Sequence, residues 1–242
     1  MTAAVVATSA NAVEVRLAVA SNFAEAIERI RPWFEAKTGH RLTLSTGSTG
    51  KLYAQIRGGA PFDVLLAADA QTPRRLETDG EGVAASRFTY AFGRLALWSA
   101  TPGVVGADGA ATLRAAQFRH LAIANPDLAP YGAAARDALR ALQSWDRLQP
   151  KIVYAQNIGH AFAMVASGNA ELGLIALSQL NTTGRTAAGS SWVVPAALHE
   201  PIRQDAVLLV RGQANAGARA FLEAMKSIEV RAMIESFGYS LE

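Results

Sequence analysis

The stretch LSTGSTGKLYAQIRGGAPFDVLLAAD, residues 44–69, decides the fold class. It starts at the end of a strand expected at 41–45 and continues through a run of serine, threonine and glycine. Leu52 and Ile56 then lie four residues apart, as on one face of a short helix, and the continuous apolar run at 63–69 is typical of a buried strand. A strand, a helix and a second strand in this order predict a parallel sheet in an α/β fold.

The same alternation of strands and helices continues along the chain. LAVASN at 17–22 and LAIANP at 121–126 each combine a strand, a small residue and an asparagine before a helix, so each is expected to open one lobe. The long apolar segments 88–98 and 201–210 are expected to cross between the lobes.

We therefore predict an α/β fold of two lobes, each a mainly parallel sheet flanked by helices, with two hinge strands joining them. A single α/β sheet without a cleft is the alternative. The expected division is lobe 1 at 13–91 plus 205–242 and lobe 2 at 92–204.

The composition excludes several classes of protein. The 242 residues carry 23 Lys+Arg and 20 Asp+Glu, a net charge of +3, without a run of five basic residues, so no nucleic-acid partner is expected. The absence of cysteine excludes disulfides and thiolate metal sites and fits either the cytoplasm or the periplasm. The four histidines have no metal-ligand spacing, so we expect no cofactor and no metal cation held by protein ligands.

Residues 1–12, MTAAVVATSANA, are small, uncharged and mostly apolar. They end in Ala10-Asn11-Ala12, a pattern of the kind cut by signal peptidase, although the positively charged start of a signal is missing. We interpret this segment as the remainder of an export signal, with an ordinary flexible N-terminus as the alternative. No apolar run reaches 18 residues, so no membrane span is expected.

Four of the expected helices begin directly after strands with similar small polar residues. Ligands in open α/β sheets lie beyond the carboxyl ends of strands, and the first turn of a helix offers free N–H groups and a positive dipole end to an anion. Ser21 and either Ser48 or Thr49 can add hydroxyl donors, while Gly50 and Gly132 are expected to let a ligand approach the backbone. Taken singly, each start is an ordinary helix cap; four converging on one cleft predict an anion site. The four starts are SN at 21–22, STGSTG at 45–50, NPDLAPYG at 125–132 and QNIG at 156–159.

Catalysis is not expected at these helix starts. The GSTG run lacks the G-x-x-x-x-G-K-[ST] pattern of a nucleotide loop, and Ser48 lies in no G-x-S-x-G elbow. An enzyme acting on a phosphate or sulfate ester would need a nucleophile with a base, or a metal cluster. An anion-sensing domain of a regulator predicts an N-terminal helix-turn-helix, for which we see no room before Val13.

Six segments, in the same order from about 13 to 240, resemble periplasmic molybdate-binding proteins, the type II solute-binding components of ABC transporters for molybdate and tungstate. The resemblance implies a periplasmic-binding-protein-like fold, export to the periplasm, and delivery of the captured oxyanion to a membrane permease, with a monomer as the expected state. A receptor for sulfate or another tetrahedral oxyanion is the alternative. The segments are AVASNFAEAIERI, STGSTGKLYAQIRGGAPFDVLLAAD, RFTYAFGRLALWS, AIANPDLAPYGAAARDAL, QNIGHAFAMVASGNAELGLIAL and ESFGY.

The resemblance also implies which residues contact the oxyanion. Of these, Tyr131 and Ile158 are expected to act through their backbone N–H groups. Some family members add a tyrosine hydroxyl from a strand LGxxY, but this chain has LGLIAL with Ala176 in that place, and Asn22 is our candidate for the replacing donor. The expected contacts are Ser21, Asn22, Thr49, Tyr131 and Ile158.

Overall fold

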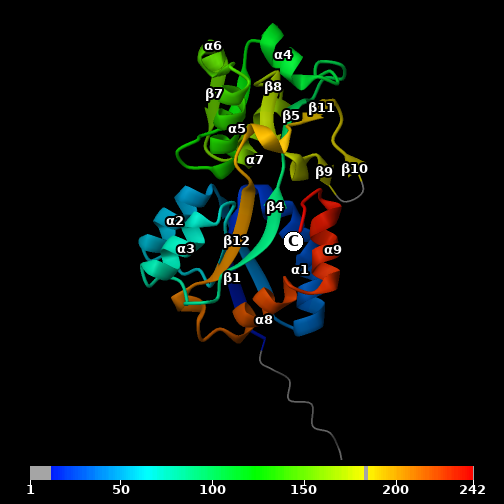
Figure 1. Ribbon diagram of the computed structural model, residues 1–242. Helices are drawn as coiled ribbons and strands as arrows, with labels where there is room; N and C mark the ends of the chain where they lie inside the picture. The colour runs from blue at the N-terminus through cyan, green and yellow to red at the C-terminus, as the bar shows by residue number, and fades with distance from the viewer. Residues whose placement is uncertain (1–11, 183–184, 242) are drawn as a thin grey trace, which may run out of the picture.

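The computed structural model describes residues 12–182 and 185–241, and it arranges them around two mixed sheets of five strands each (Figure 1). Helices flank both sheets, as the predicted α/β class requires. Apart from Ala12, the predicted export-signal remainder lies outside the described residues. Within the described ranges, every helix is too short or too polar to cross a membrane.

The first sheet, in the lower half of Figure 1, has the strand order β2-β1-β3-β12-β4. β1, β2 and β3 run parallel, whereas β12 pairs antiparallel with both β3 and β4. The last four residues of β1 are buried, because helices cover both faces of the sheet. The strands are β1 (Glu14–Ala20), β2 (Arg41–Gly47), β3 (Val64–Leu66), β4 (Phe88–Gly93) and β12 (Ile202–Leu208).

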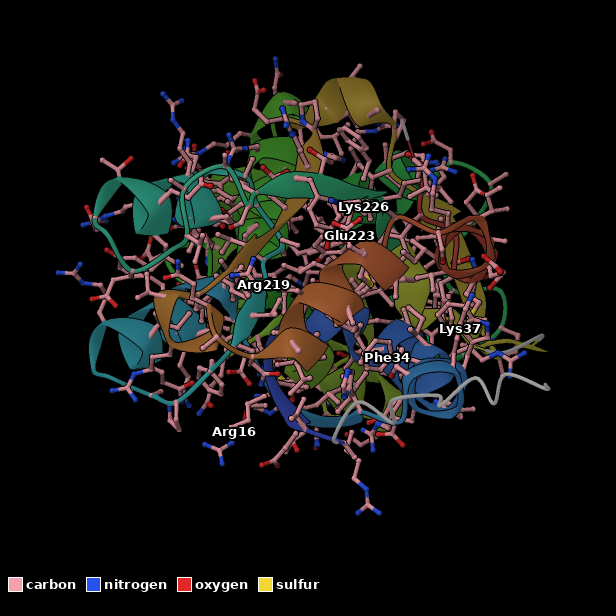
Figure 2. All side chains as sticks on the ribbon, turned by 90° about the horizontal axis from the view of Figure 1, so that it is seen from below. Arg16, Phe34, Lys37, Arg219, Glu223 and Lys226 are labelled. Atoms are coloured by element: carbon pink, nitrogen blue, oxygen red, sulfur yellow. The ribbon has the colours of Figure 1, made fainter. Side chains whose placement is uncertain are left out.

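The helices around this sheet follow signals that the sequence carries. α1 ends at Gly39, whose φ of 74° and N–H bond to the Glu35 carbonyl close the helix. Phe34 and Phe221 pack edge to face at 5.6 Å between α1 and α8, while Lys226 lies on the outer surface beside Glu223 (Figure 2). The helices are α1 (Ala24–Thr38), α2 (Thr49–Arg57), α3 (Gln71–Thr78), α8 (Ala216–Ala224) and α9 (Ile228–Ser236).

The second sheet has the order β11-β5-β8-β6-β7. β6, β7 and β8 run parallel, and β5 and β11 complete the sheet with antiparallel pairing. β9 (Asn181–Thr182) and β10 (Arg185–Thr186) pair antiparallel in a separate two-stranded sheet. The sheet strands are β5 (Leu95–Ser99), β6 (Leu121–Ala124), β7 (Ile152–Ala155), β8 (Leu172–Ala176) and β11 (Ser190–Val193). The helices are α4 (Gly109–Ala115), α5 (Pro130–Ala141), α6 (Trp145–Leu148) and α7 (Ile158–Ala166).

Two of these helices, α4 and α6, are not predicted from the sequence pattern. Both are short, and short segments give little periodic signal. The feature of the sequence that marks α4 is its N-cap residue, Asp108, whose carboxylate accepts a hydrogen bond from the Ala111 N–H at 3.2 Å.

The chain passes between the two sheets at two places. The first crossing lies between the end of β4 at Gly93 and the start of β5 at Leu95. The return crossing, from the second sheet to the first, runs from Val193 at the end of β11 to Ile202 at the start of β12. β4 therefore runs two residues past the predicted division at 91, and β12 begins three residues before 205. The exact residue bounds of the two lobes stay a prediction.

Strand β12, which follows the return crossing, contains a local irregularity. The register of β12 against β4 shifts between Gln204 and Asp205, and both side chains are fully buried. The Asp205 carboxylate accepts hydrogen bonds from Arg87 at 2.5 Å and from the Thr89 hydroxyl at 2.8 Å, which offset the cost of burying its charge. Gln204 instead contacts residues of both lobes, and its partners belong to the site described next.

Candidate anion-binding site

A small cavity lies between the lobes, where α2, α5, α7 and the short 3-10 helix η1 (Ser21–Phe23) begin. It brings together all five residues predicted as oxyanion contacts, although their role in binding stays a prediction. None of the described residues that line it is charged. The lining consists of Ala20, Ser21, Asn22, Gly47, Ser48, Thr49, Ala68, Ala129, Pro130, Tyr131 and Ile158.

Three helix N-termini supply backbone donors to this cavity. Thr49 is the first residue of α2, Ile158 is the first residue of α7, and Tyr131 follows Pro130 at the start of α5. N–H groups in these positions have no acceptor within their own helix. Each also lies at the positive end of its helix dipole, so the three together favour a negative charge in the cavity.

Three hydroxyl groups at the cavity have their oxygens engaged by backbone N–H donors. The Thr49 Oγ1 accepts from the Ala68 N–H at 3.0 Å, and the Ser48 Oγ accepts from the Lys51 N–H at 3.4 Å. The Ser21 Oγ accepts from the Gly159 N–H at 3.3 Å. Because each oxygen already accepts, its own hydrogen remains to be donated, and an anion is a suitable acceptor. The sequence left Ser48 and Thr49 as alternatives, but both line the cavity.

Tyr131 presents its backbone and its side chain to different neighbours. Its N–H lies in the first turn of α5 at the cavity, as expected from the sequence. Its hydroxyl is buried at the crossing between the sheets, where the Oη accepts from Gln204 Nε2 at 3.2 Å and lies against Gly93. Burial raises the pKa of the Tyr131 hydroxyl well above its ordinary value, so this group stays protonated.

Asn22 does not offer its amide protons to the cavity in this arrangement. The Nδ2 group donates to Gln204 Oε1 at 2.9 Å and to Tyr239 Oη at 3.0 Å. The Oδ1 atom is buried and, within the described part of the chain, has no hydrogen-bond partner. The expectation that Asn22 replaces the tyrosine missing at Ala176 therefore disagrees with this orientation of its amide. Gln204 does not line the cavity but hydrogen-bonds the side chains of Asn22 and Tyr131, and the sequence did not indicate this role.

The two glycines expected to admit a ligand have a different physical role. A Cβ on Gly132 would overlap the Ala124 carbonyl oxygen, so this glycine lets α5 pack against β6. A Cβ on Gly50 would lie 3.0 Å from the Leu128 carbonyl oxygen, which belongs to the other lobe. Both glycines therefore permit close approach of protein backbone, which corrects the prediction made for them.

Comparison with known proteins identifies the family of the chain. Residues 15–240 match the family described as "Bacterial extracellular solute-binding protein". The chain belongs to this family.

Relatives of this solute-binding protein cover nearly its whole length. The molybdate-binding protein ModA of Azotobacter vinelandii is 48% identical over 240 residues, which are 99% of this chain and 95% of that protein. ModA of Rhodobacter capsulatus is 44% identical over 229 residues, covering 95% of this chain and 89% of that protein. The solved structure of the A. vinelandii periplasmic molybdate-binding protein superimposes with a TM-score of 0.91 at 40% identity, covering 94% of this chain and 99% of that one.

These findings confirm three predictions made from the sequence: the family resemblance, the fold class, and a binding protein rather than an enzyme. Among the described residues of this solute-binding protein, no three His, Cys, Asp or Glu side chains are grouped so that they could hold a metal ion.

The two lobes of the solute-binding protein are in direct contact beside the cavity. The Gly50 N–H donates to the Leu128 carbonyl at 2.9 Å. The Ser178 hydroxyl donates to the Asn22 carbonyl at 3.2 Å. Together with the bond between Ser21 and Gly159, these contacts join the lobes around the cavity without any charged group.

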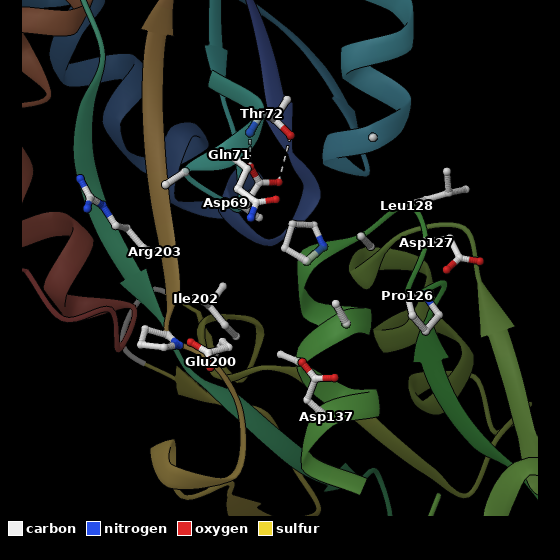
Figure 3. Close-up of a pocket in the computed structure, with 18 residues that line it drawn as sticks. Asp69, Gln71, Thr72, Pro126, Asp127, Leu128, Asp137, Glu200, Ile202 and Arg203 are labelled. Carbon is white, nitrogen blue, oxygen red and sulfur yellow. Dashed lines mark hydrogen bonds between the residues drawn. The ribbon is translucent and has the colours of Figure 1, made fainter. Parts of the chain in front are cut away.

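Figure 3 shows a wider cleft. This cleft adjoins the cavity and shares Ala68, Ala129 and Pro130 with its lining. The pKa of Asp69 in this cleft is raised by burial, against the effect of hydrogen bonds from the Thr72 N–H at 2.6 Å and the Thr72 hydroxyl at 3.1 Å. Among the described residues that line the cleft, Arg203 is the one guanidinium, and it is bonded to Asp205 at 3.3 Å. The wider cleft, here called the mouth, is therefore acidic, whereas no described residue that lines the cavity is charged. The carboxylates lining the mouth are Asp69, Asp127, Asp137 and Glu200.

Proposed function

We propose that this solute-binding protein captures molybdate, and also tungstate, between its two lobes. The observation that carries the proposal is the inner cavity, where three helix N-termini and three hydroxyl groups meet and no described lining residue is charged. Its relatives at 48% and 44% identity are molybdate-binding proteins. Molybdenum would enter as the oxyanion, whose oxygens accept hydrogen bonds, so it is a ligand and not a cofactor.

The available donors are sufficient for useful affinity. About six hydrogen bonds to a charged ligand, at roughly 1.5–3 kcal/mol each, give a gross gain on the order of 10–20 kcal/mol. Dehydration of the anion and closure of the lobes oppose this gain. A net binding free energy of about −8 to −12 kcal/mol corresponds to dissociation constants from about micromolar to nanomolar.

The chemistry of the lining also favours some oxyanions over others. Molybdate, tungstate and sulfate are fully deprotonated dianions at neutral pH, whereas phosphate keeps a proton on part of its population. A phosphate site gains from a carboxylate that accepts this proton, and no described residue that lines the cavity carries one. Sulfate has the same charge as molybdate but is smaller, so a sulfate receptor is the alternative that an experiment must separate.

The test is a thermal-shift and calorimetric panel with molybdate, tungstate, sulfate, phosphate and chromate at neutral pH. We expect a large rise in unfolding temperature, and measurable heat, with molybdate and tungstate alone, because ligand binding stabilises the native state by mass action. If sulfate raised the unfolding temperature as much as molybdate or more, the protein would be a sulfate receptor and the proposal would be wrong. A response to none of the five anions would remove it.

We further propose that the protein acts in the periplasm as a monomer and passes the anion to the permease of an ABC transporter. Closure of the lobe at 13–91 plus 205–242 onto the lobe at 92–204 would hold the anion. X-ray scattering with and without molybdate should show a smaller radius of gyration in the complex. Identical curves would count against closure, and a dimer by light scattering would count against the monomer.

A further inference from the structure

We propose that Gln204 is a positioning residue that determines whether Asn22 presents an oxygen or an N–H group to the bound oxyanion. The inference rests on the proposed function, since it deepens the account of the same cavity. Asn22 lines that cavity and is 3% exposed, whereas Gln204 lies behind it on β12 and is fully buried. Gln204 does not line the cavity itself, but it hydrogen-bonds the lining residues Asn22 and Tyr131 directly, so it acts on the cavity through them.

Gln204 lies at the register shift of β12, where its amide meets groups from both lobes. Its Oε1 accepts from Asn22 Nδ2 at 2.9 Å and lies 3.0 Å from the Tyr90 hydroxyl, which also reaches the Ala67 carbonyl at 2.9 Å. Its Nε2 donates to the Tyr131 Oη at 3.2 Å. Tyr131 belongs to α5 of the second lobe, so Gln204 connects that lobe to Asn22 of the first.

This arrangement leaves one buried polar atom without a partner. With both Asn22 protons directed to Gln204 and Tyr239, the Asn22 Oδ1 atom is the side-chain oxygen left over. A buried acceptor without a donor is unfavourable, and an oxygen turned towards an anion would repel it. The proton of the Tyr131 hydroxyl likewise has no acceptor among the hydrogen bonds of the described residues.

A half-turn of both amide planes satisfies every group in this network when the Tyr239 hydroxyl also turns its proton from the Asn22 carbonyl to Asn22 Oδ1. The Asn22 carbonyl then keeps its hydrogen bond from the Ser178 hydroxyl. Gln204 Nε2 then donates to Asn22 Oδ1 and to the Tyr90 oxygen, while Tyr90 donates to the Ala67 carbonyl. Gln204 Oε1 accepts the proton of Tyr131. Asn22 Nδ2 takes the place of the unpartnered oxygen and becomes a donor available to the oxyanion.

The two amides must turn together, because a turn of one alone places two oxygens or two N–H groups face to face at 2.9 Å. Occupation of the cavity by an anion favours the state with the Asn22 N–H free. Gln204 transmits that preference to Tyr131, which lies across the crossing between the sheets. Gln204 thereby couples the orientation of the Asn22 amide at the ligand to the hydrogen bond that it makes with Tyr131 of the other lobe.

The test is a double-mutant cycle on molybdate affinity, measured by calorimetry, with Gln204→Met and Asn22→Ala. We expect Gln204→Met to weaken binding about tenfold, the value of one hydrogen bond to a charged ligand. In the Asn22→Ala protein the same substitution should change the dissociation constant less than about twofold, because Gln204 then has no amide to orient. Gln55→Met, at an exposed position of α2, is the matched control and should leave affinity unchanged.

A measurement on the wild-type protein keeps the inference testable if Gln204→Met does not fold. The side-chain amide resonances of Asn22 and Gln204 in ¹⁵N-labelled protein should both shift when molybdate is added. Equal losses of affinity from Gln204→Met with and without Asn22→Ala would overturn the inference, as would amide resonances that do not move. In both cases molybdate binding by the wild type would leave the proposed function standing, whereas no binding would overturn both.

Discussion

Replacement of Thr49 by valine tests the cavity at the residue whose hydrogen bonds are most completely defined. Thr49 is 1% exposed, and its Oγ1 accepts from the Ala68 N–H at 3.0 Å. Valine has the same shape but can neither accept from Ala68 nor donate to an anion. Thr49→Val therefore removes two hydrogen bonds, one of which exists only when the ligand is bound.

The lost hydrogen bond to the anion affects the binding affinity, and the lost hydrogen bond from Ala68 affects the stability of the protein. The lost donor to a dianion should weaken molybdate binding by about 1.5–3 kcal/mol, or roughly 10- to 150-fold. The unpaired Ala68 N–H should lower the stability of the unliganded protein by about 1–3 kcal/mol. For a chain of this size the unfolding temperature falls by about 2–4 °C for each kcal/mol.

Calorimetric titration gives the first quantity and scanning calorimetry without ligand gives the second. Thr49→Ser keeps the hydroxyl and should retain most of the affinity, while Thr46→Val, at an exposed position of β2, should change neither quantity. An unfolding temperature that falls while the dissociation constant stays within twofold of wild type would show that Thr49 only supports the backbone. That result would refute the assignment of its hydroxyl to the anion.

Three further substitutions address the lobe contact, the pH dependence and the mouth of the cleft. Gly50→Ala places a Cβ 3.0 Å from the Leu128 carbonyl oxygen of the other lobe and should loosen the contact between the lobes. Molybdate should then dissociate about 5–10 times faster in stopped-flow measurements. An unchanged dissociation rate with an unchanged unfolding temperature would contradict this. The Arg119 hydrogen bond lowers the pKa of Glu171 to about 2, so its stabilisation is present above about pH 4.5 and is lost as pH falls towards 2. Glu171→Gln should therefore lower stability at pH 7, by about 0.5–1 kcal/mol for this partly exposed pair, and less at pH 2.5; an equal difference at both pH values would contradict it. Asp137→Asn should raise the association rate of molybdate at low salt and not at high salt, and a rate independent of ionic strength would show that the mouth does not steer the anion.

The sequence was sufficient to predict the parts of the site that depend on local order. A helix that begins directly after a strand is visible in a single stretch of chain, and Thr49, Tyr131 and Ile158 all lie at such starts. Because the carboxyl ends of parallel strands meet at one edge of a sheet, these starts could be expected to converge. The family resemblance added which of them face one another.

Other features of the site depend on contacts that sequence order does not reveal. Gln204 lies 182 positions from Asn22, and no local pattern connects an isolated glutamine in an apolar strand to that asparagine. The role of Gly132 was misread for a related reason, since the atom that excludes a side chain there is the Ala124 carbonyl and not a ligand. In each case the deciding partner lies on another element.

The same amide pair bears on selectivity between dianions and protonated anions. With Oδ1 as the free atom of Asn22, the cavity has a side-chain acceptor that suits the proton of hydrogenphosphate; with Nδ2 in that place it has one more donor and suits molybdate. The hydrogen bond between the two amides makes the orientation of Asn22 depend on that of Gln204. In Gln204→Met the Asn22 amide keeps its hydrogen bond with Tyr239 and can adopt either orientation. We therefore expect this substitution to weaken molybdate binding about tenfold and phosphate binding much less, which narrows the ratio of the two dissociation constants. Competition titrations at pH 7.5 measure that ratio directly, and a loss of the same factor for both anions would mean that the orientation of Asn22 does not discriminate between them.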